Sequence, residues 1–191
     1  MPVFTSDLET MPNEPISNII AGLGNLWEAL YVYHANDMIH GDIKAPNVAY
    51  RKDRRGPSMF AFTDWGWSFD IRDCREAERA LALMRRHPDY TPSEYGGNGG
   101  IWAPILFDEK YSGCAHARSL LQFNDIFCLA YMQLDILGFI LDRPASQLRQ
   151  TGFRKIQKIY ETLEHIFQNQ SAYAFVGTPA IVKHLLPLFK L

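Results

Sequence analysis

The sequence predicts a mainly helical domain with one short β-hairpin, and three observations support this. Apolar residues recur every three or four positions over several long stretches, which is typical of amphipathic helices. Two short apolar runs, residues 48–50 and 59–62, flank a polar segment, which is typical of a hairpin. The chain has 191 residues, of which 47% are hydrophobic and 21% charged, so it is long enough for one domain with a sizeable core.

The first predicted helix begins near residue 16. Residues 1–15 contain Pro2, Pro12 and Pro15 among polar residues, which indicates an extended or turn-like start rather than a packed element. From residue 16 to residue 30 the apolar residues follow helical spacing, and Asn13 or Ser17 is available as a cap. The glycines at 22 and 24 fall inside this pattern with no strand before them, so they do not indicate a phosphate-binding loop.

Further helices are predicted later in the chain. Helical spacing recurs over residues 70–86, 126–141, 153–167 and 181–189. Pro88 and Pro92 end the first of these segments. The second is apolar on all sides but is interrupted by Gln133 and Asp135, so we expect a buried core helix and not a membrane span.

Composition excludes several classes of partner and site. The formal net charge of −2 gives no reason to expect nucleic acid or an anionic membrane as a partner. The cysteines Cys74, Cys114 and Cys128 are odd in number and show no C-x-x-C spacing, so neither a disulfide framework nor a structural zinc site is predicted. With no secretory signal at the amino terminus, these features favour a reducing compartment, either cytoplasmic or nuclear.

Two polar islands between apolar segments carry the candidate chemistry. Residues 40–47 read His-Gly-Asp-Ile-Lys-Ala-Pro-Asn, so Asp42, Lys44 and Asn47 lie on one short loop. These side chains can converge on a nucleotide triphosphate, its metal ion and an acceptor hydroxyl. Asp64 follows seventeen residues after Asn47, in a second charged island. Each of these residues alone fits a surface ion pair or a turn, and only the set indicates phosphoryl transfer.

These islands resemble the motifs of the protein-kinase-like superfamily, whose catalytic loop reads His-Arg-Asp-x-Lys-x-x-Asn and whose metal-binding turn reads Asp-Phe-Gly. The positions that match are His40, Asp42, Lys44, Asn47, Asp64 and Gly66. Gly41 stands where Arg is usual, and Trp65 stands where Phe is usual. The resemblance implies a carboxy-terminal kinase lobe, mainly helical, with the short hairpin beside the catalytic loop.

The resemblance also implies a role for each matching residue. Asp42 would accept or orient the proton of the attacking hydroxyl, and Lys44 would contact the γ-phosphoryl oxygens of ATP. Asn47 and Asp64 would be oxygen ligands of Mg²⁺, so ATP and Mg²⁺ are the implied cofactors.

Structural roles are implied for three other positions. His40 would be a packed residue that holds the loop, and Gly66 would allow the turn that aims Asp64 inward. Asp125 matches the kinase Asp that bonds the catalytic-loop backbone, although an acidic helix cap is the alternative reading.

The resemblance covers residues 1–191 as a single lobe. Residues 1–15 would lie at the hinge, and residues 64–104 would form a long activation segment with an inserted helix that leads to Ala-Pro. Ile105 stands where the family places Glu, so the salt bridge that steadies this floor is expected to be absent or replaced. The family's glycine-rich loop and strand Lys have no counterpart in the sequence, so the amino-terminal lobe is expected to be absent and Mg²⁺-ATP to bind weakly or not at all.

Three functions remain open on these residues. The first is a Ser/Thr protein kinase lobe that acts on a protein substrate, with its amino-terminal lobe supplied in trans. The second is a pseudokinase-type binding module for a partner protein. The third is a small-molecule phosphotransferase, because His-Gly-Asp also occurs in the aminoglycoside and choline kinase relatives. Lys44 and the Ala103-Pro104 pair argue against the third.

Overall fold

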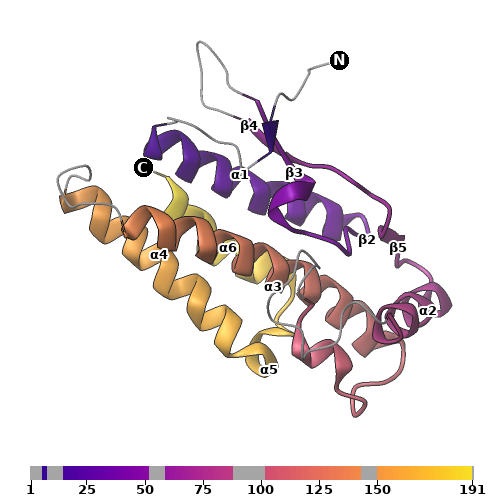
Figure 1. Cartoon of the computed structure of the whole chain (residues 1–191). Helices are drawn as coiled ribbons and strands as arrows, with labels where there is room; N and C mark the ends of the chain where they lie inside the picture. Colours follow the sequence, from indigo (N-terminus) through magenta and orange to yellow (C-terminus); the bar gives the residue numbers. More distant parts are fainter. Residues whose placement is uncertain (1–5, 8–14, 52–58, 88–101, 143–149, 191) are drawn as a thin grey trace.

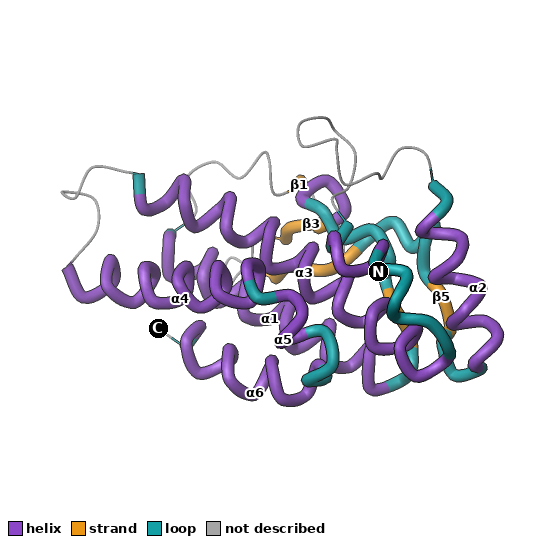
Figure 2. The backbone as a smooth tube through the Cα atoms, turned by 90° about the horizontal axis from the view of Figure 1, so that it is seen from below, coloured by secondary structure: helices purple, strands orange, loops and turns teal. Residues whose placement is uncertain are grey.

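The fold is mainly helical and carries a small sheet along one side of its first helix (Figure 1). The computed structural model describes residues 6–7, 15–51, 59–87, 102–142 and 150–190. The helices are α1 (Ile16–Ala35), α2 (Cys74–Arg85), α3 (Cys114–Leu141), α4 (Gln150–Gln168), α5 (Gln170–Tyr173) and α6 (Thr178–Phe189). Short 3₁₀ turns cover Ala45–Asn47 and Pro104–Phe107. Helix accounts for most of the described chain, and the strands are short (Figure 2).

The strands form two small antiparallel sheets. The predicted hairpin is confirmed as β3 (Val48–Arg51) paired with β4 (Met59–Phe62), and β1 (Ser6–Asp7) adds to the free side of β3. The second sheet pairs β2 (Met38–Ile39) with β5 (Phe69–Asp70). Beyond the hairpin the sequence predicts only helices, and that prediction is wrong for β1, β2 and β5. Strands of two residues are too short to show a period of two in the sequence.

Helix α1 lies between the small sheet and the other long helices (Figure 1). Its apolar face is buried at Ile20, Leu23, Leu26, Trp27 and Leu30, as the helical spacing predicts. Pro15 is the N-cap, and no side chain caps the helix. The prediction of a side-chain cap is therefore wrong for the residue at 17, which lies inside the helix, while the residue at 13 lies outside the described residues.

Glycines let α1 approach its neighbours closely. A Cβ at Gly22 would overlap the ring of Phe60 on β4, and one at Gly24 would lie 2.7 Å from Cβ of Phe189 on α6. Both glycines are buried in the helix and neither carries a positive φ, so close packing and not backbone conformation selects them. The structure confirms that neither belongs to a phosphate-binding loop.

Replacing Gly22 by Ala is expected to destabilise the fold by about 2–3 kcal/mol, because the buried Phe60 ring must leave its place. Gly152→Ala is the matched control, since Gly152 is also helical and a Cβ there meets nothing within 4 Å. The control is expected to gain about 0.5–1 kcal/mol from helix propensity. Denaturant unfolding of both variants measures the difference, and equal stabilities would contradict the close approach of α1 to β4.

Helix α3 is the central helix of the core. It extends from Cys114 to Leu141, longer than the predicted 126–141, and packs against α4, α2 and α1. Its length and composition alone would let it cross a membrane, but 61% of its most apolar window is buried inside the fold. The buried Gln133 accepts a hydrogen bond from Trp27 Nε1 (2.9 Å) and donates one to Leu23 O (3.0 Å). The prediction of a buried core helix is confirmed.

Cys74 and Cys114 form a disulfide that joins the first residue of α2 to the first residue of α3. Their Cα atoms lie 5.0 Å apart, within the usual range for this bond. The prediction of no disulfide is therefore wrong, because these cysteines are 40 residues apart and meet only in the fold. The third cysteine, Cys128, is a buried thiol; burial raises its pKa well above the ordinary value, and the carboxylates of Asp125 and Asp42 add to the rise.

The helix expected at residues 70–86 is confirmed as α2, which Asp73 caps. The Asp73 side chain accepts hydrogen bonds from the backbone N–H groups of Arg75 and Glu76. The helix ends at Arg85, before the first of the two prolines, and both prolines lie outside the described residues. The helices expected from residues 153 and 181 are confirmed as α4 and α6.

Candidate functional site

The loop at residues 40–47 lies between β2 and β3, and the two sheets bring the second island to it. Pairing of Met38 with Asp70 and of Ile39 with Phe69 places the chain after Asp64 alongside the start of the loop. Thr63 N donates to Asn47 O (2.8 Å), which ties the end of β4 to the end of the loop. The two polar islands, separate in sequence, therefore lie beside each other.

The backbone at the start of the loop is held by the carboxylate of Asp125, which is completely buried on α3. Asp125 Oδ2 accepts a hydrogen bond from His40 N (2.7 Å), and Oδ1 accepts one from Gly41 N (2.8 Å). A carboxylate that accepts backbone N–H bonds away from water makes strong, charge-assisted contacts. Asp125 lies in the middle of α3, so it is not a helix cap, and the alternative reading of this residue is wrong.

The side chains of Asp42, Lys44 and Asn47 converge. Lys44 Nζ lies 2.8 Å from Asp42 Oδ2, and Asn47 Nδ2 donates to the same oxygen at 2.9 Å and to Asp42 O at 2.9 Å. The Asp42 side chain is 7% exposed and that of Lys44 is 28% exposed, so the carboxylate lies at the base of the group and the ammonium nearer to solvent. Asp42 Oδ1 is buried and has no hydrogen-bond partner among the described residues. A buried carboxylate oxygen without a donor costs free energy, which a hydroxyl placed there would recover.

His40 connects this group to the second island. Its Nε2 lies 3.0 Å from Thr63 O, and a carbonyl only accepts, so Nε2 carries the proton. The other ring nitrogen, Nδ1, then accepts from Asp42 N at 3.3 Å. The ring also packs against Phe62 and Trp65, with centroids 5.4 and 4.4 Å away. His40 thus has both nitrogens engaged within the protein.

Asp64 is exposed and adopts a left-handed backbone conformation, with φ 56°. Its Oδ1 accepts a hydrogen bond from Gly66 N (3.3 Å). Non-glycine residues rarely take a positive φ, and those that do gather at functional sites. The sequence predicts that Gly66 supplies the turn, but Gly66 shows no positive φ, so Asp64 itself supplies the unusual conformation.

Gly41 stands at a position of the loop where the structure leaves no room for a side chain. Its φ is 79°, and a Cβ at this position would overlap the backbone carbonyl of Trp67. On the other side of the loop, Trp102 Nε1 donates to Gly41 O (3.0 Å). The rings of Trp67 and Trp102 contact each other with centroids 5.7 Å apart. Only glycine fits between the Asp125 carboxylate and this tryptophan pair.

Replacing Gly41 by Ala is expected to destabilise the protein by about 2–4 kcal/mol, because left-handed strain adds to the overlap with Trp67 O. Gly113→Ala is the matched control. Gly113 has a similar φ of 86°, but a Cβ there meets nothing within 4 Å, so about 1 kcal/mol of strain is expected alone. Thermal unfolding of both variants tests the difference, and equal losses would mean that Trp67 does not restrict the loop.

The backbone at residues 103–105 is held by amide side chains. Ala103 N donates to Asn124 Oδ1 (2.9 Å), and Ile105 N donates to Gln170 Oε1 (3.1 Å). At position 105, where the resemblance predicts that a salt bridge is absent or replaced, Gln170 of α5 fixes the backbone. Arg85 of α2 donates to the carbonyls of Leu106, Asp108 and Tyr111. The glycine-rich residues 95–100 lie outside the described residues.

Sequence reasoning misses two buried polar residues behind the loop. His34 and Thr178 are buried, and the His34 ring lies within hydrogen-bond distance of both Thr178 and Asp125. Both look like ordinary positions of amphipathic helices in the sequence. The only available signal is that His34 falls on the buried side of α1, four residues after Leu30.

The residues present could bind Mg²⁺ only if a phosphate group supplied some of its other ligands. In the part of the chain that the structure describes, no cluster of His, Cys, Asp and Glu could hold a metal ion by itself. Asn47 and Asp64 offer an amide and a carboxylate oxygen, the ligand types that Mg²⁺ accepts, and Mg²⁺ commonly takes its other ligands from water and nucleotide phosphates. The donor set therefore fits a metal that arrives with a nucleotide.

Comparison with known proteins assigns no family to the chain. No protein-family model matches it, and no curated protein is significantly similar to it.

Proposed function

We propose that the chain is a protein-kinase-like carboxy-terminal lobe that transfers the γ-phosphoryl group of ATP to a Ser or Thr hydroxyl of a protein substrate. The proposal depends on how the two carboxylate oxygens of Asp42 are bonded. One oxygen of its buried carboxylate is shared by Lys44 and Asn47, and the other has no partner among the described residues. That oxygen would bond an acceptor hydroxyl once the groups that close it off from solvent move aside.

Asp42 would accept the hydrogen bond of the substrate hydroxyl at Oδ1 and orient its oxygen for attack. Because Oδ2 is already engaged by Lys44 and Asn47, the carboxylate cannot rotate freely, which aims Oδ1. Lys44 is partly exposed beside it, so its ammonium can offset negative charge on the transferred group. Phosphoryl transfer depends mainly on such positioning and charge neutralisation.

Asn47 and Asp64 would hold the Mg²⁺ that accompanies ATP. Asn47 uses its Nδ2 on Asp42, which leaves the amide oxygen for the metal. Bound there, Mg²⁺ would neutralise phosphate charge. The bond from His40 to the carbonyl of Thr63 links the loop to the segment that carries Asp64. The two residues proposed for the metal are therefore held by the same contact.

A binding module without catalysis is the second candidate, and one observation favours it. Asp42, Lys44 and Asn47 bond one another, and Asp125 and Trp102 hold the loop backbone, all within the protein. The motif residues therefore also stabilise the fold, which a pseudokinase-type scaffold for a partner protein would need. A small-molecule phosphotransferase is less favoured, because of Lys44.

The proposal includes a cytoplasmic or nuclear location, a protein substrate or partner, and an amino-terminal lobe that comes from outside residues 1–191. In such compartments disulfides are mostly transient or redox-sensing, so the bond between Cys74 and Cys114 would form and open with the local thiol state.

Titration of the isotope-labelled chain with Mg²⁺-ATP, followed by NMR, tests the proposal. We expect weak binding with Kd of about 1 mM, equivalent to about −4 kcal/mol, and shifts confined to residues 40–47 and 64–66. Asp64→Asn is expected to remove the Mg²⁺ dependence of those shifts, whereas Asp70→Asn, a change on the neighbouring β5, should keep it. If no amide of residues 40–47 responds to Mg²⁺-ATP even when an amino-terminal lobe is joined to the chain, the proposal of nucleotide chemistry at this loop is wrong and the binding module remains.

A further inference from the structure

A chain of buried polar groups connects the last helix to the candidate loop. Thr178, the first residue of α6, is fully buried, and its Oγ1 lies 2.6 Å from Nδ1 of His34 on α1. The other ring nitrogen, Nε2, lies 3.1 Å from Asp125 Oδ2 on α3. That same oxygen accepts the hydrogen bond from His40 N at 2.7 Å. Three helices thus meet through polar atoms directly behind the loop.

The direction of the bond between His34 and Asp125 follows from the other contacts of the carboxylate. Both oxygens of Asp125 already accept backbone N–H bonds, so His34 donates to Oδ2 from Nε2. The hydroxyl of Thr178 can donate to Nδ1 or accept from it, so it bonds this nitrogen whether or not the nitrogen carries a hydrogen. The Thr178 hydroxyl therefore fixes the ring orientation in which His34 contacts Asp125.

We infer that Thr178 is a positioning residue for the candidate phosphotransfer loop. Its hydroxyl orients His34, His34 fixes the carboxylate of Asp125, and Asp125 sets the backbone that carries Asp42. The inference deepens the proposed function and rests on it only where turnover is measured, because the effect on the loop backbone exists without nucleotide.

Packing alone does not require a hydroxyl at this position. Val has nearly the shape of Thr and would fill the same space on α6 without a polar atom. A buried hydroxyl costs free energy unless it is bonded, and here its partner is a histidine 144 residues earlier in the chain. The hydroxyl therefore matters through His34.

Thr178→Val and Thr178→Ser form a matched pair for the test. Val keeps the shape and removes the hydroxyl, whereas Ser keeps the hydroxyl and removes the methyl group. Amide hydrogen exchange of His40 and Gly41, measured without nucleotide, is expected to be about tenfold faster in the Val variant and close to wild type in the Ser variant. The ¹⁵N shifts of the His34 ring should report loss of the Nδ1 hydrogen bond in Val alone.

Turnover gives the second readout where the protein transfers phosphate. Thr178→Val is expected to lower kcat by about tenfold with KM unchanged, and Thr178→Ser to restore it. If the wild type transfers no phosphate even when joined to an amino-terminal lobe, the proposed function fails while the exchange result still decides the role of Thr178. Unchanged exchange at His40 and Gly41 in the Val variant, or equal acceleration throughout the core, would overturn the inference.

A measurement on the wild type covers the case in which the Val variant does not fold. Native-state exchange at low denaturant is expected to show the amides of His40 and Gly41 opening together with those of α6, with the same free energy and denaturant dependence. Opening of the loop while α6 stays closed, through a separate and smaller transition, would show that Thr178 does not hold it.

Discussion

Replacing Asp42 by Asn is expected to lower the rate of phosphoryl transfer by about 100- to 10,000-fold, because the amide keeps the shape of the side chain but loses the charge and the basic oxygen. The amide oxygen in the Asp42→Asn variant can still accept hydrogen bonds from Lys44 and Asn47, so the fold should persist. The measurement is transfer of labelled phosphate from ATP to a Ser/Thr acceptor protein, with the chain joined to an amino-terminal lobe if it needs one.

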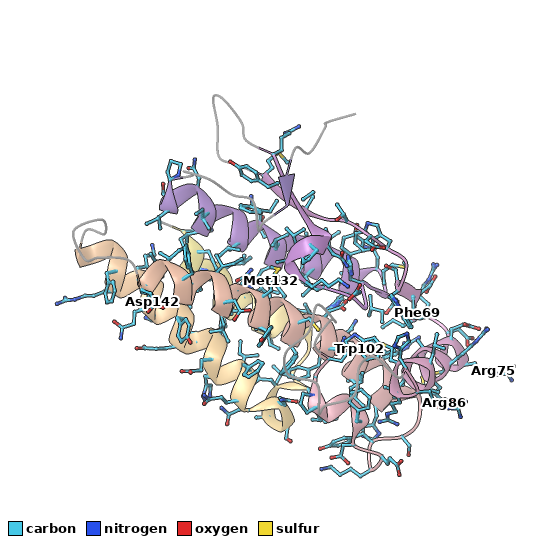
Figure 3. All side chains as sticks on the ribbon, in the orientation of Figure 1. Phe69, Arg75, Arg86, Trp102, Met132 and Asp142 are labelled. Atoms are coloured by element: carbon cyan, nitrogen blue, oxygen red, sulfur yellow. A yellow bond between two sulfur atoms is a disulfide. The ribbon has the colours of Figure 1, made fainter. Side chains whose placement is uncertain are left out.

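The control for this experiment is Asp142→Asn. Asp142 is exposed at the carboxyl end of α3, far from Trp102, which contacts the loop (Figure 3). The control should keep wild-type activity. Full activity in Asp42→Asn would remove Asp42 from the chemistry and favour the binding module.

Opening the disulfide between Cys74 and Cys114 is expected to cost about 4 kcal/mol of stability, because the bond closes a loop of 40 residues in the unfolded chain. For a domain of this size the midpoint of thermal unfolding should fall by about 8–15 °C. The measurement compares thermal unfolding with and without a dithiol reductant, which reduces the bond to two cysteine thiols and is itself oxidised to a cyclic disulfide.

The double variant Cys74→Ser, Cys114→Ser supplies the control, since reductant should leave its midpoint unchanged. Thiol alkylation of the folded, unreduced protein should label neither Cys74 nor Cys114, and the buried Cys128 should react only after unfolding. Labelling of Cys74 and Cys114 without reductant would show that the bond does not form.

The helices could be predicted from sequence because each carries its own period of apolar residues. The apolar face of α1 and the all-round apolar pattern of α3 are local signals, and both are buried as the patterns predict. The site loop could be predicted for a similar reason, since Asp42, Lys44 and Asn47 contact one another within six residues.

What the sequence could not show depends on contacts between distant residues. Cys74 contacts Cys114 only once α2 packs against α3, and Thr178 contacts His34 only once α6 packs against α1. Asp64, and not Gly66, is the left-handed residue, and the carbonyl of Thr63 just before it bonds the distant His40 ring. Spacing along the chain carries none of this information.

The burial of α3 has a consequence for biosynthesis. Helices α1 and α2 precede this apolar helix and cover part of it, but the face that packs on α4 and α6 stays uncovered while the ribosome makes residues 142–189. Such a segment is prone to aggregation until its cover arrives. The backbone N–H groups of residues 40 and 41 also lack their acceptor until Asp125 is made, more than 80 residues later. The nascent chain should therefore depend on chaperones, and the loop at residues 40–47 should be among the last parts to become ordered.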